Sequence, residues 1–323
     1  MSDFRTLKGL YIKHVSSDPS NLVAGDIWYN TTTQTLKVAP LLGAWASGGN
    51  RNNSMYDGTG FGIQTALVAA GGITDEQTAI CETYDGSSWT ETNDLNTARG
   101  QCGGAGTATA GVVFGGELAP PGSQAPTAVC EEYNGTSWSE SGDLNNTRKQ
   151  TSGFGIQTAA VCVGGTPGVS QSTEEYNGTS WANGENFGTA RAGDAGSAGT
   201  LTAGIIYGGG PGRTVNCETY DGTDWTEVAN LNEATTNAGR AGTGTSALSI
   251  SGTDPGGTRA DVESWNGTSW TEIGNVSTGR TRPMSDGADN TSAVIGGGSA
   301  PGGVTNATEE FTEAVTARTW DTT

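Results

Sequence analysis

The sequence predicts an all-β fold built from six repeats of four strands, and three observations predict it. A tryptophan recurs along the chain with gaps of 43 to 49 residues. Each interval holds the same succession of short apolar run, paired glycines, acidic strand and tight turn. With 53 Gly and only 33% hydrophobic residues, the chain cannot be a Leu-rich helical bundle. The repeated tryptophans are Trp45, Trp89, Trp138, Trp181, Trp225 and Trp270.

The first two strands of each repeat, a and b, are expected in a stretch rich in Gly, Ala and Thr and in the apolar run that follows it. Runs such as LVAAGG (67–72) and GVVFGG (111–116) are too short for helices. They end in two glycines, which let the backbone turn. Only the fifth repeat departs from the glycine pair, with Ser251 and Gly252.

The last two strands, c and d, are expected to form a hairpin. ETYDGSSW (82–89) and EEYNGTSW (131–138) place Asp-Gly or Asn-Gly between two extended runs, which is a strong hairpin signal. We expect the Asp or Asn to take the positive φ that a type I′ turn requires. Four strands repeated six times at about 45 residues are typical of a six-bladed β-propeller.

The repeats also carry a resemblance to known families. The glycine pair, the Glu-x-Tyr of strand c and the following Trp resemble kelch-type propeller repeats over residues 45–323. The turn Y-[DN]-G-T-S-W, followed by links such as DLNTAR (94–99), resembles propeller proteins of tailed phages of marine bacteria. GDIWYNTTTQTLKV (25–38) is similar to a hairpin near the ends of phage tail and fibre proteins. The resemblance implies a kelch-like fold and a bacteriophage virion protein of the tail, fibre or baseplate.

Two parts are expected: an N-terminal arm with the WYNT hairpin, residues 1–41, and a propeller, residues 42–323. The sixth repeat has its strand c at 307–314, but Thr316 stands where its tryptophan would be. We therefore expect residues 42–47 to serve as strand d of the sixth blade. This closes the ring and removes strand edges that would otherwise recruit other chains.

A glutamate seven residues before each repeated tryptophan is the most regular charged feature, and an arginine recurs near the start of most strands a. Because a part-buried carboxylate is costly unless paired or hydrogen-bonded, we expect each Glu to meet an Arg or a cluster of backbone amides. A ring of carboxylates that binds cations is the alternative; no metal or cofactor is predicted. The residues are Glu82, Glu131, Glu174, Glu218, Glu263 and Glu309, with Arg99, Arg148, Arg191 and Arg280. Met55 and Thr235 replace the arginine in the other two repeats.

The aromatic residue two positions after each of these glutamates is expected to pack between blades with the repeated tryptophan. Aromatic faces also bind sugars, and that alternative stays open here.

The charge balance disfavours several partners. With 34 acidic and 15 basic residues, the net charge is −19. Nucleic acid requires clustered Lys and Arg, and an anionic membrane surface attracts cationic segments, so neither is expected to bind. No run of 18 apolar residues and no signal-peptide core occur, which predicts a soluble protein made in a cytoplasm. The phage resemblance implies that it is then incorporated in the virion. The five cysteines have no CxxC pairing and are expected to be reduced and buried.

Enzyme activity is not expected. His14 is the only histidine and lies outside the repeats, which disfavours a Ser-His-Asp triad and a copper radical oxidase site. Strand a lies nearest the axis and reads as small residues, as in GQCGGAG (100–106), so the axis is expected to hold few chemical groups. A sialidase-like glycosidase remains an alternative, because the YDGSSW turn resembles the Asp-box of sialidases. The arginines at one repeat position would, however, be spread around the ring.

The loops between strands b and c are the candidate binding surface, because they differ in length and are stiffened by proline. Preorganised loops lose little entropy on binding, although loops that merely tolerate variation are an equal alternative. The candidate binding residues are Pro120, Pro121, Gln124, Gln171, Arg213, Asp254, Arg259 and Asn306. Trp28 and Tyr29 are the candidates for docking to other virion proteins, and Trp320 for an edge strand or docking tail.

These features together predict a non-enzymatic virion protein that recognises a host-surface polysaccharide or protein. An architectural or head-decoration role, a sialidase-like glycosidase and a cellular kelch-like adaptor are the alternatives. The sequence leaves open whether the protein is a monomer or a trimer, because residues 1–40 contain no coiled-coil heptad.

Overall fold

The computed structural model describes residues 12–19, 26–38, 41–118, 125–168, 170–191, 195–315 and 318–319. The chain divides into two compact units, Trp45–Phe311 and a smaller one that combines Met1–Ala44 with Thr312–Thr323. The boundaries between the two units fall inside two strands, Leu41–Ser47 and Thr308–Val315. In the part of the chain that is described, no helix is long and apolar enough to cross a membrane.

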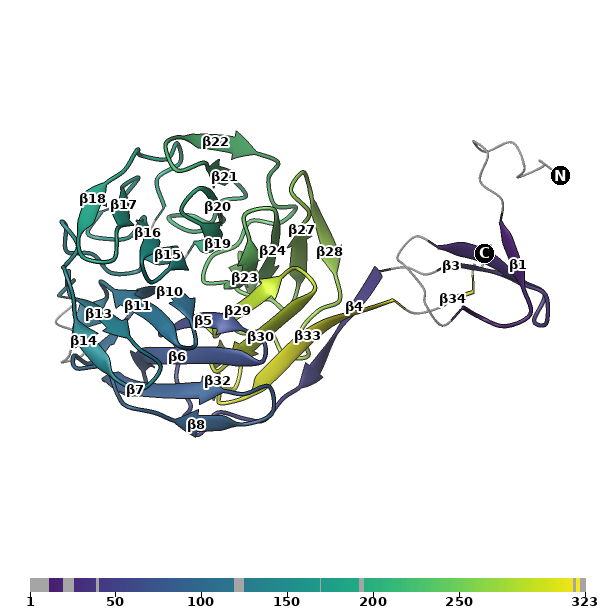
Figure 1. The fold of residues 1–323 in the computed structure, drawn as a ribbon, viewed down its shortest axis with the longest axis horizontal. Coiled ribbons are helices and arrows are strands. Elements are labelled where there is room, and N and C mark those ends of the chain that lie inside the picture. The colour runs from purple at the N-terminus through teal and green to yellow at the C-terminus, as the bar shows by residue number, and fades with distance from the viewer. Residues whose placement is uncertain are drawn as a thin grey trace. The chain divides into compact units, whose positions relative to one another are not determined.

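The larger unit is a β-propeller of six four-stranded antiparallel sheets, so the fold class expected from the sequence is confirmed (Figure 1). From the axis outward, the blades are β5 (Thr59–Ile63), β6 (Ala66–Ile73), β7 (Gln77–Tyr84) and β8 (Trp89–Glu91); β10 (Gly103–Thr107), β11 (Ala110–Phe114), β13 (Cys130–Tyr133) and β14 (Trp138–Glu140); β15 (Ser152–Ile156), β16 (Ala159–Val163), β17 (Thr173–Tyr176) and β18 (Trp181–Asn183); β19 (Gly196–Thr200), β20 (Ala203–Tyr207), β21 (Cys217–Tyr220) and β22 (Trp225–Val228); β23 (Gly239–Thr243), β24 (Ser246–Ile250), β27 (Val262–Trp265) and β28 (Trp270–Ile273); and β29 (Met284–Asp289), β30 (Ser292–Gly296), β33 (Thr308–Val315) and β4 (Leu41–Ser47). The innermost strands contact one another in the order β5, β10, β15, β19, β23, β29 and back to β5, which closes the ring.

The sixth blade combines strands from both ends of the repeat region. β4 is its outermost strand and lies beside β33. Trp45 of β4 packs on Phe311 of β33, with ring centroids 5.2 Å apart. Thr316 and Trp320 lie outside the described residues. The interpretation of ring closure partly depended on Thr316, and that of a docking tail on Trp320.

Short two-stranded pairings extend the blades on the loop side, and the smaller unit has a sheet of its own. The short pairs are β9 (Arg99–Gly100) with β12 (Glu117–Leu118), β25 (Thr253–Asp254) with β26 (Gly257–Thr258), and β31 (Ser299–Ala300) with β32 (Gly303–Val304). The sheet of the smaller unit has the order β1 (Lys13–Val15), β2 (Ile27–Asn30), β3 (Thr35–Val38) and β34 (Arg318–Thr319). β2 and β3 form the hairpin that the WYNT sequence predicts.

The hydrophobic core lies between neighbouring blades. Tyr133 and Trp138 stack within one hairpin, with ring centroids 4.8 Å apart. Phe61 and Val68 of the preceding blade pack against them in one buried cluster. The expectation that the repeated aromatic residues pack between blades is confirmed, and burial of such large side chains contributes much of the stability of each interface.

The c–d turns differ from the expected type I′ geometry. The flanking strands leave a four-residue loop in the first blade. Asp85 is not among the described residues with positive φ; its Oδ1 accepts hydrogen bonds from the backbone N–H groups of Ser87 and Ser88 at 2.9 and 2.8 Å. Only Gly86 takes positive φ, at 90°. The position therefore requires a short side-chain acceptor, which Asp and Asn both supply. The same bonds recur at Asn134, Asn177, Asp221 and Asn266.

Candidate functional site

Five of the six repeated glutamates form buried salt bridges with an arginine, an arrangement we call the clamp. In the fourth blade, Arg191 Nη2 lies 2.7 Å from Glu218 Oε1. Arg191 Nη1 also donates to the backbone carbonyls of Gly208 at 2.8 Å and Asn216 at 2.6 Å. The five pairs are Arg51–Glu82, Arg99–Glu131, Arg148–Glu174, Arg191–Glu218 and Arg280–Glu309.

Backbone amides complete the coordination of the clamp carboxylates. Glu218 Oε1 accepts a hydrogen bond from the N–H of Thr189 at 3.1 Å, and Glu218 Oε2 accepts one from Gly188 at 2.5 Å. Each clamp thus joins strand c of a blade to the link that enters the blade. Because these carboxylates are enclosed by donors, their arrangement favours the structural interpretation over a six-fold ring of cation sites.

Two blades depart from the pattern. In the first blade, where Met55 stands at the repeat position, Arg51 supplies the guanidinium and its Nε lies 2.8 Å from Glu82 Oε2. Sequence reasoning missed Arg51 because it lies four residues upstream of the expected position. In the fifth blade, Glu263 has no ion pair with any described residue and accepts hydrogen bonds from backbone N–H groups, including that of Asn232 at 2.8 Å.

The expected binding residues of the b–c loops bond mostly within the loops or to the neighbouring links. Gln171 Nε2 donates to the carbonyl of Gly188, and Asp254 Oδ1 accepts from the N–H of Gly257 at 2.9 Å. Arg259 is buried, with its Nε 3.2 Å from Asp261 Oδ2. Asn306 donates a hydrogen bond to the carbonyl of Arg51, and Arg213 is half-buried with a φ of 59°. The remaining candidates lie outside the described residues: Pro120, Pro121 and Gln124.

The candidate docking residues of the smaller unit lie largely in its interior. Trp28 is only 2% exposed, and its Nε1 donates to Asp18 Oδ1 at 3.1 Å. Lys37 Nζ lies 2.7 Å from Asp18 Oδ2. Hydrogen bonds from Lys37, Asn30 and Trp28 lower the pKa of Asp18 to about 2. Tyr29 is half-buried, whereas its neighbour Ile27 is 45% exposed. Trp28 therefore holds the unit together, and the exposed part of the hairpin includes Ile27.

A ring of polar residues surrounds the axis where the links enter strands a, on the same face as the b–c loops. Its described members all take positive φ although none is glycine: Asp57, Gln101, Gln150, Asn237 and Arg282. Backbone hydrogen bonds join them around the axis, such as Gln101 N–H to the Asp57 carbonyl at 2.6 Å and Arg282 N–H to the Asn237 carbonyl at 2.8 Å. Arg282 Nη1 also lies 3.0 Å from Asp57 Oδ2. These bonds compensate for the unfavourable backbone conformation.

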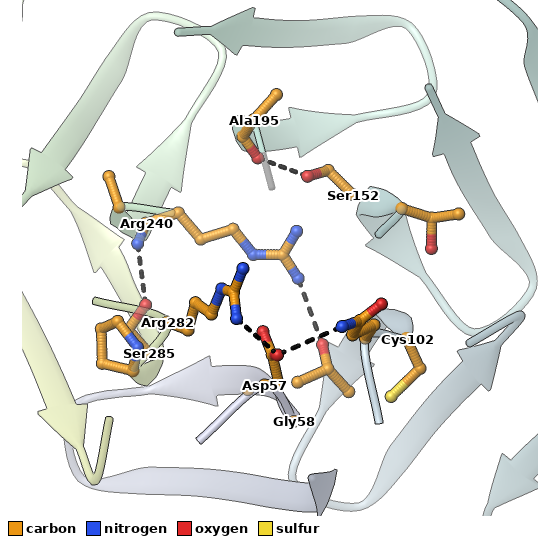
Figure 2. A pocket seen from close by; sticks show the side chains of 14 residues that line it. Asp57, Gly58, Cys102, Ser152, Ala195, Arg240, Arg282 and Ser285 are labelled. Carbon is orange, nitrogen blue, oxygen red and sulfur yellow. Dashed lines mark hydrogen bonds and ion pairs between the residues drawn. The ribbon is translucent and has the colours of Figure 1, made fainter. Parts of the chain in front are cut away.

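Arg240 of β23 extends from the wall into the middle of the axial channel, as Figure 2 shows. Its Nη1 donates to the carbonyl of Gly153 at 2.7 Å and to Ser197 Oγ at 2.8 Å. Its Nη2 donates to the carbonyl of Gly104 at 3.0 Å and to Thr59 Oγ1 at 3.4 Å. One side chain thus connects the innermost strands of five blades.

Asp286 of β29 lies beyond Arg240 along the channel, toward the a–b turns. Its carboxylate accepts hydrogen bonds from the N–H groups of Gly62 at 3.0 Å and Gly287 at 2.8 Å. Burial raises the pKa of Asp286 to about 7, against the opposing effect of the Arg240 charge. The expectation of an axis with few chemical groups is therefore wrong. The signal was in the sequence, since GRAGTG (239–244) and MSDGAD (284–289) carry charges that the other strands a lack.

The loop-face end of the channel is a cavity of about 50 Å³, lined among others by Asp57, Arg240 and Arg282 (Figure 2). This volume accommodates a few water molecules and is too small for a sugar ring. Ser152 donates its hydroxyl proton to the carbonyl of Ala195, and burial raises the pKa of Cys102 to about 11. Neither of these two groups is an activated nucleophile.

A larger cavity of about 450 Å³ lies on the loop face between the second and third blades. Its volume falls in the range of small-ligand sites, about 300–1,000 Å³. Lys149 Nζ and Glu117 Oε2 meet there at 3.1 Å. Sequence reasoning missed both residues, although Lys149 is the only lysine between residues 45 and 323. The lining residues are Gln101, Glu117, Pro126, Lys149, Gln150, Thr166 and Pro167.

Comparisons with known proteins show the fold of the chain. No family model matches it, and no curated protein sequence matches it. Among solved structures, it is similar to one described as "Structure of YjhT", with 16% sequence identity and a TM-score of 0.64. The match covers 80% of this chain and 95% of that one. At this identity the likeness supports the propeller fold alone.

Proposed function

We propose that the chain is a non-enzymatic structural protein of a tailed-phage virion, carried at the tail, fibre or baseplate, and that its loop face recognises the host surface. The kelch-like repeats, the Y-[DN]-G-T-S-W turns and the WYNT hairpin support the virion assignment by resemblance. The net charge of −19 suits a particle exterior and disfavours contact with packaged DNA.

The contrast between the two propeller faces supports recognition by the loop face. The c–d turns on the opposite face are short, alike and internally hydrogen-bonded, as at Asp85 and Asn134. The loop face holds the cavity with the Lys149–Glu117 pair, which is the observation that carries this proposal. A polar cavity with one ammonium and one carboxylate can hydrogen-bond the hydroxyl groups of a polysaccharide.

The smaller unit is the proposed attachment to the particle. It contains the WYNT hairpin and pairs β3 with β34, so that segments from before and after the propeller meet in one sheet. With Trp28 in its interior, Ile27 and the exposed edge of Tyr29 are the proposed contacts to other virion proteins.

Binding of the labelled, purified full chain to host cells and to a panel of bacterial surface polysaccharides tests the proposal. Lys149→Met should weaken saturable binding at least tenfold, because it removes the cavity ammonium. Lys13→Met is the matched control, since Lys13 is an exposed lysine of β1 in the smaller unit. Absence of any binding by the unaltered chain at tens of micromolar would reject recognition and favour the architectural role. Turnover of a polysaccharide would instead favour a glycosidase.

A further inference from the structure

The fifth blade keeps the acceptor groups of the clamp but lacks its arginine. In the fourth blade, the guanidinium of Arg191 lies among three oxygen atoms: Glu218 Oε1 at 2.7 Å and the carbonyls of Gly208 and Asn216 at 2.8 and 2.6 Å. In the fifth blade, Thr235 stands at the position of this arginine.

The corresponding oxygen atoms of the fifth blade follow from the register. The N–H of Ser251 donates to the carbonyl of Asp261 at 2.9 Å. The same bond in the fourth blade joins Gly208 to Asn216 at 3.2 Å. The clamp glutamate lies two residues after the accepting carbonyl in both blades and is Glu263 in the fifth. The carbonyls of Ser251 and Asp261 and the carboxylate of Glu263 therefore reproduce the acceptor set.

The side chain that replaces the arginine brings a fourth oxygen atom. Thr235 is 3% exposed, and its Oγ1 has no hydrogen-bond partner. A Cβ on Gly252 would lie 2.6 Å from this oxygen. At the matching glycine of the second blade, Gly116, a Cβ would lie 3.5 Å from Arg99 Cδ. The Thr235 hydroxyl thus lies beside the same repeat glycine as the stem of the arginine in the second blade.

Among the residues that the structure describes, the clamp glutamate of the fifth blade lacks a counter-charge. Glu263 is 3% exposed and has no ion pair among the described residues, whereas each of the other five clamp glutamates has one. A buried carboxylate without a counter-charge is costly, even when backbone amides donate to it. One bound positive charge would give the fifth blade the same balance as the other five.

We propose that the fifth blade binds a monovalent cation of the size of K⁺, coordinated by Glu263, the carbonyls of Ser251 and Asp261, and the Thr235 hydroxyl. In the fourth blade, the two carbonyls bind Arg191 Nη1 and the carboxylate binds Arg191 Nη2, so the three oxygen atoms enclose a space wider than a single nitrogen. Ca²⁺ and Mg²⁺ need closer ligands, at about 2.3–2.6 Å and about 2.0–2.1 Å. A single carboxylate also matches one positive charge better than two.

Thermal unfolding of the full chain in different chloride salts at constant ionic strength tests the proposal. The unaltered chain should have a higher Tm in KCl than in choline chloride, by at least about 2–4 °C, because a ligand bound only to the folded state stabilises it. Thr235→Arg should raise the Tm in choline chloride and abolish the difference between the salts. Thr200→Arg, which adds the same charge at an exposed residue, should keep the difference.

A crystallographic measurement locates the ion without reliance on stability. Crystals of the unaltered chain soaked in RbCl should show an anomalous peak beside Glu263, and crystals of Thr235→Arg should not. Equal Tm values of the unaltered chain in the two salts, a salt dependence that persists in Thr235→Arg, or the absence of the peak in the unaltered chain would each overturn the proposal.

Discussion

Replacing Arg191 by Met should destabilise the propeller by about 3–5 kcal/mol, the usual loss when one partner of a buried ion pair is removed. Arg191 is 1% exposed and Met preserves much of its apolar stem, so little of the effect comes from a cavity. What remains is the Glu218 carboxylate, 3% exposed, and two carbonyls that lose their donor. Unpaired buried acceptors cost about 1–3 kcal/mol each, which makes the estimate for the whole clamp a conservative one.

Urea unfolding followed by tryptophan fluorescence measures this loss. The double variant Arg191→Met with Glu218→Gln should be about 1–2 kcal/mol more stable than Arg191→Met alone, because a neutral amide is cheaper to bury than a carboxylate. Arg213→Met is the control, since Arg213 forms no ion pair with the described residues, and it should change stability by about 1 kcal/mol or less. A loss below about 1 kcal/mol for Arg191→Met, or a double variant less stable than the single one, would refute the clamp.

Three further predictions concern the axis and the thiols. The pKa of Asp286 rises from 3.8 to about 7 on folding, so its proton stabilises the folded state most at low pH and less as the pH rises through this window. The Tm of the native chain relative to Asp286→Asn should therefore fall from about pH 4 to pH 7 and then level off. A constant Tm difference would contradict the raised pKa. Arg240→Ala should lower the free energy of unfolding, measured in urea, by about 2 kcal/mol or more, because it removes hydrogen bonds from a charged donor to several blades. An unchanged free energy of unfolding would show that these bonds do not stabilise the ring. All five cysteines are buried, and burial raises the pKa of Cys81 to about 12. A thiol reagent should therefore react slowly with the native chain and should label five thiols per chain after denaturation. Fast labelling of the native chain would refute the burial.

The repeated parts of the fold were predictable because each depends on local sequence. Paired glycines, the Glu-x-aromatic strand and the Asp-Gly or Asn-Gly turn lie within one repeat, and comparison of the repeats fixes their register. The turn geometry itself was misjudged, because a side-chain acceptor and a positive φ select the same residues at this position, as Asp85 illustrates.

The features that depend on contacts between blades were harder to predict. Arg51 reaches Glu82 from outside the repeat register, and Arg240 contacts strands a that are up to 181 residues away in sequence. Periodicity contains no information about a side chain that crosses a six-fold axis. The Lys149–Glu117 pair likewise joins a link to the loop of another blade, and only the rarity of lysine in the repeats could have indicated it.

A reconstruction of the phage particle at a resolution that distinguishes blades tests the proposed role most directly. We predict a six-bladed density at the tail, fibre or baseplate, with the smaller unit in contact with other virion proteins and the cavity of Lys149 open to solvent. Absence of the propeller from the particle would contradict the virion assignment. A loop face buried against other virion proteins would contradict host recognition.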